Sequence, residues 1–166
     1  VARLRVPKIV QGKPVTAVGA LGTGWLISPR LLVTNHHVVN AREQGRPAAI
    51  NSDFKEQAEN TVAWFDYLVE GGKKTEIAVV ELVCSNPALD YAILRLADDA
   101  ALDTRVRIPV QQKEPQLERG NRLNIIQYPD GGPMRLAIRN NFYVGRGEKQ
   151  FQIRYLTDTI QGSSGS

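Results

Sequence analysis

The sequence predicts an all-β chain, and three observations support this fold class. Short apolar segments of the kind that form β-strands follow one another at close spacing through the 166 residues. Glycine, proline and asparagine, which favour turns, separate these segments. Only residues 52–60 (SDFKEQAEN) indicate a helical turn, for which Ser52 or Asp53 is the expected N-cap. Many short strands with frequent turns are typical of β-sandwiches and β-barrels.

The expected strands follow one another along the chain. Residues 16–29 (TAVGALGTGWLISP) predict a strand pair interrupted by glycines, and residues 30–39 (RLLVTNHHVV) predict a further strand. Residues 61–70 and 75–83 flank a Gly-Gly-Lys-Lys turn and predict a hairpin. Four more segments continue the series, namely residues 91–96, 121–129, 134–145 and 151–158.

The composition is that of an ordinary globular protein, with 42% hydrophobic and 23% charged residues. No apolar run approaches the roughly 18 residues that a membrane-spanning helix needs. The net charge is +4, but the 21 Lys and Arg residues are scattered among 17 acidic ones. They form no basic stripe interleaved with aromatic residues, as single-strand binders have. We therefore expect neither a membrane nor a nucleic acid as a partner.

The first ten residues and the cysteine content bear on the cellular setting. Residues 1–10 (VARLRVPKIV) contain neither an initiator Met nor the apolar core of a signal peptide, so we expect the chain to begin inside a longer parent or after processing. Cys84 is the single cysteine, which excludes an internal disulfide and favours a reducing compartment. We expect a bacterial cytoplasmic protein, with a periplasmic or secreted one as the alternative, because bacterial secreted proteins can also lack disulfides.

Three short segments contain candidates for catalytic chemistry. His36 and His37 end a predicted strand, Asp90 begins another, and residues 160–166 (IQGSSGS) end the chain. Each has an ordinary alternative: such histidines are often structural, an Asp after a turn often binds backbone, and a Gly/Ser run resembles a linker. No metal site is expected, because adjacent strand residues point to opposite faces. The serine elbow of α/β-hydrolases does not fit either, because it needs a strand-to-helix turn.

The candidates occur in the order His, Asp, Ser, which is the order in chymotrypsin-like serine peptidases. From about Val15 to Ser166, the chain resembles bacterial trypsin-like peptidases of the HtrA and glutamyl-endopeptidase (V8-like) kind. It also resembles, more loosely, the trypsin-like domain of bacterial multi-domain conflict-system proteins. Four segments carry the resemblance: GTGWLISPRLLVTNHHVV, LDYAILRL, IIQYPDGG and YLTDTIQGSSGS.

The resemblance implies a fold and a reaction. The fold is a chymotrypsin-like double β-barrel, with about residues 1–100 in the first barrel and about residues 101–166 in a second barrel truncated at its C-terminus. The reaction is hydrolysis of a protein or peptide substrate by a serine endopeptidase, through an acyl-enzyme intermediate and without a metal or organic cofactor. His37 would be the general base, Asp90 the orienting carboxylate and Ser164 the nucleophile, while His36 fills a variable position.

The local spacing singles out Ser164 among the last serines. Gly162 lies two residues before it and Gly165 directly after it, and small neighbours let the backbone approach a scissile carbonyl. Neither Ser163 nor Ser166 has glycines at both places. By the same resemblance, the backbone N–H groups of Gly162 and Ser164 would form the oxyanion hole.

Two more residues are candidates for substrate binding. Asp158, six residues before Ser164, matches the position of the pocket-floor carboxylate that selects Arg or Lys in trypsins, and Gln161 matches a residue at the pocket rim. An unpaired carboxylate in a desolvated pocket favours a basic side chain. The alternative is that Asp158 binds nearby backbone and braces the loop of Ser164.

Departures from the animal trypsins suggest how the protein is regulated. Ser163 stands where those enzymes have the Asp that pairs with a new N-terminus, so we expect regulation by attached domains of the parent chain instead of zymogen cleavage. The chain ends two residues after Ser164, so we expect the natural protein to continue and these 166 residues alone to be inefficient. The alternatives are a catalytically inactive β-barrel binding module and a periplasmic HtrA-type quality-control protease.

Overall fold

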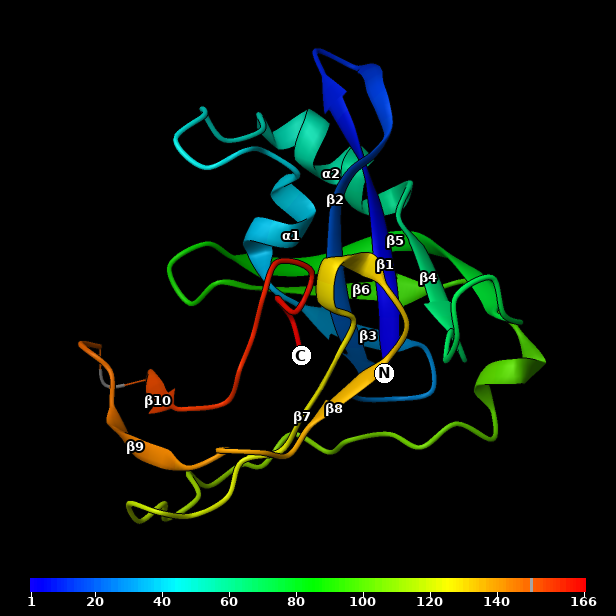
Figure 1. The fold of residues 1–166 in the computed structure, drawn as a ribbon. Coiled ribbons are helices and arrows are strands. Elements are labelled where there is room, and N and C mark those ends of the chain that lie inside the picture. Colours follow the sequence, from blue (N-terminus) through cyan, green and yellow to red (C-terminus); the bar gives the residue numbers. More distant parts are fainter. Residues whose placement is uncertain (150) are drawn as a thin grey trace.

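The computed structural model describes residues 1–149 and 151–166 of the chain. Its main body is a closed barrel of six antiparallel strands in the order β1-β2-β3-β6-β5-β4 (Figure 1). The predicted all-β fold class is therefore confirmed. The barrel strands are β1 (Ala2–Val10), β2 (Lys13–Leu26), β3 (Leu31–Thr34), β4 (Val62–Phe65), β5 (Thr75–Asn86) and β6 (Tyr91–Leu96).

Strand β1 has the alternation of buried and outward residues that a half-buried strand requires. Ala2, Leu4 and Val6 are fully buried in the barrel, whereas Arg3 and Arg5 lie between them and are only partly covered. Successive side chains of a strand point to opposite faces, so this pattern puts every second residue into the core. No strand was predicted for this segment from its sequence, so β1 is an additional strand.

Strand β2 corrects the expectation of a strand pair interrupted by glycines. It is a single strand of 14 residues that pairs with β1 along most of its length. Its glycines permit close approach of neighbouring strands instead of breaking the strand. A side chain on Gly19 would overlap Lys8 of β1, and one on Gly24 would overlap Leu32 of β3.

The histidine segment also differs from its prediction, because residues 36–39 are helical and not part of a strand. Strand β3 ends at Thr34, and the short helix α1 (His36–Asn40) follows. Val38 and Val39 are both buried, whereas adjacent residues of a strand would face opposite sides. The helical turn lets both valines enter the core.

Helix α2 (Asn51–Glu59) confirms the predicted helical segment but not its N-cap. The cap position is Ile50, and neither Ser52 nor Asp53 caps the helix. The Asp53 carboxylate instead accepts hydrogen bonds from the backbone N–H groups of Gln11 and Gly12, each at 2.9 Å, in the β1–β2 turn. Among the residues that the structure describes, no helix has the length and apolar character needed to cross a membrane.

The predicted hairpin around the Gly-Gly-Lys-Lys turn is confirmed, since β4 pairs antiparallel with β5. Strand β4 is shorter than predicted, and β5 continues to Asn86, where it pairs with β6. The barrel encloses the main hydrophobic core. Its fully or almost fully buried large side chains include Leu4, Val6, Leu26, Leu32, Phe65, Leu94 and Leu96.

After β6 the chain forms shorter elements. The 3₁₀ helix η1 (Ala100–Leu102) begins this part, and the described residues after it form two separate two-stranded sheets and no closed barrel. The predicted strands 121–129 and 151–158 are present but short, and segment 134–145 contains two strands. These elements are β7 (Ile125–Gln127), the 3₁₀ turn η2 (Pro129–Gly131), β8 (Arg135–Ala137), β9 (Tyr143–Arg146) and β10 (Ile153–Tyr155).

Candidate active site

His37 and Asp90 form the best-defined contact of the site. Asp90 Oδ2 lies 2.8 Å from His37 Nδ1, and Asp90 Oδ1 accepts a hydrogen bond from the backbone N–H of His37 at 3.0 Å. The two side chains remain 55% and 43% exposed, so both are accessible from solvent. One carboxylate thus holds both the backbone and the ring of His37, which fixes the ring orientation.

Asp90 owes its position to the turn before β6. Its backbone φ of 53° lies in the left-handed region, which Asp adopts more readily than most residues. The carbonyl of Asp90 accepts a hydrogen bond from Asn35 Nδ2 at 2.8 Å, so this turn is joined to the start of α1. Asn35 was not among the predicted site residues, although it lies in the TNHHV segment that carried the prediction.

His36 occupies a different environment from its neighbour. Its ring stacks on Phe54 of α2, with centroids 4.5 Å apart, and its buried Nδ1 has no hydrogen-bond partner among the described residues. Burial lowers the pKa of the His36 imidazole below its ordinary value of 6.5. His36 is therefore a packing residue between α1 and α2.

The loop of Ser164 lies directly on the barrel. The backbone N–H of Thr23, in β2, donates to the Ser164 carbonyl at 2.7 Å. Gly22 lies between this carbonyl and the side chain of Val38, the residue after His37, because a Cβ on Gly22 would contact both. Among the described residues, Ser164 Oγ makes no hydrogen bond to the imidazole of His37. The structure thus joins His37 to Asp90 and places the Ser164 loop beside α1.

Two glycines give this loop its shape. Gly162 and Gly165 have backbone φ values of 88° and 90°, which residues other than glycine rarely adopt. A Cβ on Gly165 would overlap the Thr23 carbonyl, and one on Gly162 would overlap the backbone after β7. Within the described residues, the N–H groups of Gly162 and Ser164 donate no hydrogen bond. The loop therefore presents two unused donors.

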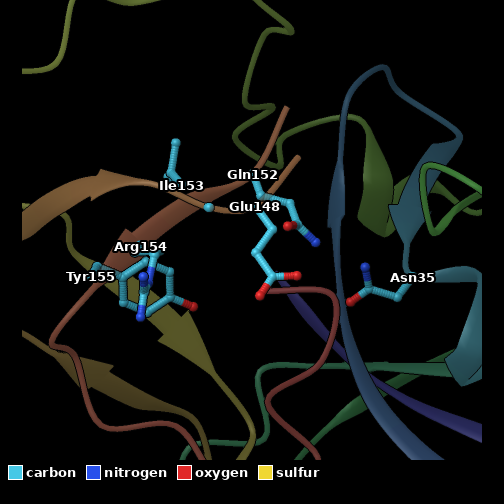
Figure 2. A pocket seen from close by; sticks show the side chains of 7 residues that line it. Asn35, Glu148, Gln152, Ile153, Arg154 and Tyr155 are labelled. Atoms are coloured by element: carbon cyan, nitrogen blue, oxygen red, sulfur yellow. The ribbon is translucent and has the colours of Figure 1, made fainter. Parts of the chain in front are cut away.

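Two cavities are lined by residues of the Ser164 loop, and a third lies next to one of them. One of about 370 Å³ contains Ser164 and its neighbours, and one of about 230 Å³ is lined by Gly162, Gln161 and residues of β2. The largest, of about 610 Å³, lies between Asn35 and the β9–β10 hairpin, with Glu148 on the hairpin side (Figure 2). Asn35 and Tyr155 line both this cavity and that of Ser164, so the two adjoin.

The two predicted substrate-binding residues lie in different places. Gln161 lines the smallest of the three cavities, and its carbonyl accepts a hydrogen bond from the Asp130 N–H at 2.6 Å. The side chain of Asp158 is exposed and lines none of these cavities. Its carbonyl accepts from Gln127 Nε2 at 3.2 Å, whereas its carboxylate makes no hydrogen bond among the described residues.

The fold and site define a class of protein. The chain belongs to the trypsin-like peptidase domain family, whose model matches residues 22–166. This match includes His37, Asp90 and Ser164 and covers most of the chain. The chain is accordingly a domain of the trypsin-like serine proteases, a class of hydrolases.

One curated relative matches the chain over its whole length. The chain is 28% identical over 178 residues to the uncharacterized protein y4fB of Sinorhizobium fredii, with all of this chain but only 25% of that protein in the match. The chain thus spans a quarter of this relative's length.

Two solved protease structures share the fold. The Rv3671c protease of M. tuberculosis, in its active form, is 22% identical with a TM-score of 0.56, and 99% of this chain matches 62% of that one. Deg5 is 18% identical with a TM-score of 0.62, and 99% of this chain matches 70% of that one. This likeness confirms the predicted chymotrypsin-like fold.

Proposed function

We propose that this domain is a serine endopeptidase that cleaves protein or peptide substrates with His37, Asp90 and Ser164. One observation carries the proposal: Asp90 binds both the ring and the backbone of His37. A carboxylate held against Nδ1 fixes the tautomer in which Nδ1 carries the proton and Nε2 is a free base. An Asp that only stabilised the turn would need no contact with the His37 ring.

The proposed reaction follows from these positions. Nε2 of His37 takes the proton of the Ser164 hydroxyl as Oγ attacks the peptide carbonyl, and the imidazolium then gives this proton to the leaving amine. Water releases the acyl group from Ser164 by the same steps, and Asp90 stabilises the imidazolium each time. The missing Ser164–His37 hydrogen bond is compatible with this role, because such bonds are often formed only with substrate bound.

The N–H groups of Gly162 and Ser164 complete the proposed site. They are the unused donors of the loop, and an oxyanion bound by them would gain two hydrogen bonds in the transition state. Loss of one such donor typically costs about 2.7–4 kcal/mol of transition-state stabilisation. This assignment needs no metal ion or organic cofactor for any step.

Covalent labelling tests the function. A fluorophosphonate probe should label Ser164 of the natural full-length protein, with the site identified by mass spectrometry. Ser164→Ala should abolish labelling, and His37→Ala should slow it by a factor of about 10⁴–10⁶. Ser52→Ala, which removes an exposed serine of α2, is the matched control and should label normally. An inactive binding module would leave every form of the protein unlabelled.

The preference for the residue before the cleaved bond is a separate proposal, namely cleavage after Arg or Lys. It rests on the position of Asp158, six residues before Ser164, and on its free carboxylate. A peptide library that varies this residue tests it with the wild type and Asp158→Ala. The variant should lose the basic preference. A wild type that prefers Glu or small apolar residues, or a variant that keeps the basic preference, would make Asp158 a structural residue.

A further inference from the structure

Thr23 is a buried threonine whose polar groups all form hydrogen bonds. The residue is completely inaccessible to solvent. Its N–H donates to Ser164 O at 2.7 Å, and its carbonyl accepts from Thr34 Oγ1 at 2.7 Å. Its hydroxyl donates to Gly162 O at 3.0 Å and accepts from the Tyr128 N–H at 3.1 Å. The direction of both hydroxyl bonds is fixed, because a backbone N–H only donates and a carbonyl only accepts.

These bonds join three segments that are distant in the sequence. Thr23 lies in β2, Tyr128 immediately precedes the turn η2, and Gly162 belongs to the loop of Ser164. Figure 1 shows η2 and the C-terminal loop side by side over β2. The hydroxyl of Thr23 is in contact with both of the other segments, so a single oxygen atom connects the barrel, the turn and the loop.

The bonds also determine which way the loop backbone faces. The carbonyl of Gln161 accepts from the Asp130 N–H in η2, and those of Gly162 and Ser164 accept from Thr23. In a planar trans peptide the N–H points opposite to the preceding carbonyl. The bond to Gln161 therefore orients the N–H of Gly162 away from η2.

The hydroxyl of Thr23 holds the carbonyl of the peptide unit between Gly162 and Ser163, and the Ser163 N–H of the same unit donates to Ile160 O at 3.1 Å. This unit connects the two unused N–H groups of the loop, those of Gly162 and Ser164. If it rotated, its carbonyl would leave Thr23 and the relative direction of the two donors would change. The Tyr128 N–H would then keep its acceptor, but the Thr23 hydroxyl would lose the group to which it donates.

We propose that the Thr23 hydroxyl is a positioning group that sets the loop conformation in which the Gly162 and Ser164 N–H groups converge on a substrate oxyanion. This inference rests on the serine endopeptidase function proposed above. Thr23 acts through the loop and does not touch the substrate.

Three variants of the full-length protein test this role. Thr23→Val keeps the shape of the side chain without the hydroxyl, and Thr23→Ser keeps the hydroxyl. Thr61→Val is the matched control, because Thr61 is equally buried and its hydroxyl donates to Gln57 O at 2.8 Å, within the α2 region. The measured quantities are the rate of fluorophosphonate labelling, kcat and KM for a peptide substrate, and the unfolding midpoint in urea.

Thr23→Val should slow labelling and lower kcat by at least about tenfold with little change in KM, because the donors act in the transition state. Thr23→Ser and Thr61→Val should label at close to the wild-type rate. The proposal is overturned if Thr23→Val labels like the wild type, or if Thr61→Val slows labelling equally. A wild type that does not label contradicts the peptidase function itself, which separates the two failures.

Amide hydrogen exchange of the wild type decides the question if Thr23→Val does not fold. The Tyr128 N–H should be protected by the Thr23 hydroxyl, whereas the N–H groups of Gly162 and Ser164 should exchange faster. Slow exchange at Gly162 and Ser164, or fast exchange at Tyr128, would overturn the proposal.

Discussion

At the scale of single residues, Asp90 shows how one carboxylate can serve two donors. One oxygen accepts from the His37 backbone and the other contacts His37 Nδ1. The contact with Nδ1 orients the His37 ring, and the bond to the backbone N–H holds the main chain that carries this ring. Asn35 Nδ2 also donates to the Asp90 carbonyl, so both the backbone and the side chain of Asp90 are bound to the segment that carries His37.

Replacing Asp90 by Asn tests this arrangement. The amide keeps the shape of the side chain, but its NH₂ group only donates, so the single remaining oxygen can accept from the His37 backbone or from Nδ1 and not from both. With the NH₂ group facing Nδ1, the ring of His37 adopts the wrong tautomer. Labelling of Ser164 should slow by about 10⁴-fold. The urea midpoint should change little, because the Asp90 side chain is 43% exposed. Wild-type labelling by Asp90→Asn would remove Asp90 from the catalytic assignment.

His36 provides a test of pH dependence. Burial lowers its pKa in the folded chain below the ordinary value of 6.5, although Asp90 opposes this shift and His37 adds to it. The unfolded chain therefore binds the proton more readily. The stability contributed by neutral His36 is complete above about pH 6.5 and is lost as the pH falls through the folded pKa.

The matched variant is His36→Phe, which keeps an aromatic ring on Phe54 without a titrating group. Urea unfolding at several pH values between 7.5 and 5 should show a steeper loss of stability in the wild type than in His36→Phe. Parallel pH profiles of the two proteins would show that burial does not shift the His36 pKa.

The sequence revealed the site residues only in part. The pairing of His37 with Asp90 was predicted and is present in the structure, whereas the contact of His37 with Ser164 remains a prediction. Thr23 and Asn35 were missed although both lie in the segments that suggested the family. Their importance depends on hydrogen bonds to distant residues, such as that between Thr23 and Gly162, 139 positions apart, which no local pattern reveals.

At the scale of elements, the β1–β2 hairpin and α2 are held together by a buried polar network. Asp53 binds the turn at Gln11 and Gly12, and Gln57 accepts from the Ile9 N–H at 3.0 Å. Arg42 lies within 3.6 Å of Asp53. Buried polar groups are costly unless they are hydrogen-bonded, and this network satisfies them.

Asp53→Ala should therefore lower the free energy of unfolding by about 3 kcal/mol, because two backbone donors lose a charged acceptor. Lys55→Ala, on the same helix but exposed, is the control and should change it by less than about 0.5 kcal/mol. Denaturant unfolding measures both. Labelling of Ser164 should persist in each variant at temperatures where it remains folded. An equal effect of the two substitutions would show that the network adds no stability.

The errors in the predicted elements have physical causes. Glycines in β2 indicated interruptions, but they accommodate Lys8 and Leu32 of the neighbouring strands. The apolar pair Val38 and Val39 indicated a strand, but tertiary packing buries both in a helical turn. Local pattern predicted the β4–β5 hairpin correctly, because a turn and two strands close in sequence determine it.

At the scale of the whole molecule, the two parts of the chain are stabilised differently. Among the described residues, the main hydrophobic cluster includes only ones between Ala2 and Leu102. The remaining part is joined to the barrel by hydrogen bonds, including Met134 N–H to Tyr67 O at 2.9 Å and those of Thr23. Within the described stretch after Leu102, the buried large apolar or aromatic residues are few, namely Ile125, Tyr128 and Tyr143.

This asymmetry predicts that the chain of residues 1–166 opens in two steps. Backbone amides in the short sheets β7–β8 and β9–β10 should exchange on the order of 100-fold faster than those of the barrel strands, because few apolar contacts oppose their opening. Limited trypsin digestion should first cut the segment between η1 and β7, where Lys113 and Arg119 are exposed. The surviving fragment should contain the barrel.

Lys113→Gln combined with Arg119→Gln is the control and should slow this first cut while the exchange pattern stays the same. Equal protection of both parts would instead mean that the barrel and the remaining sheets unfold as a single cooperative unit, and that hydrogen bonds through residues such as Thr23 are sufficient to couple them.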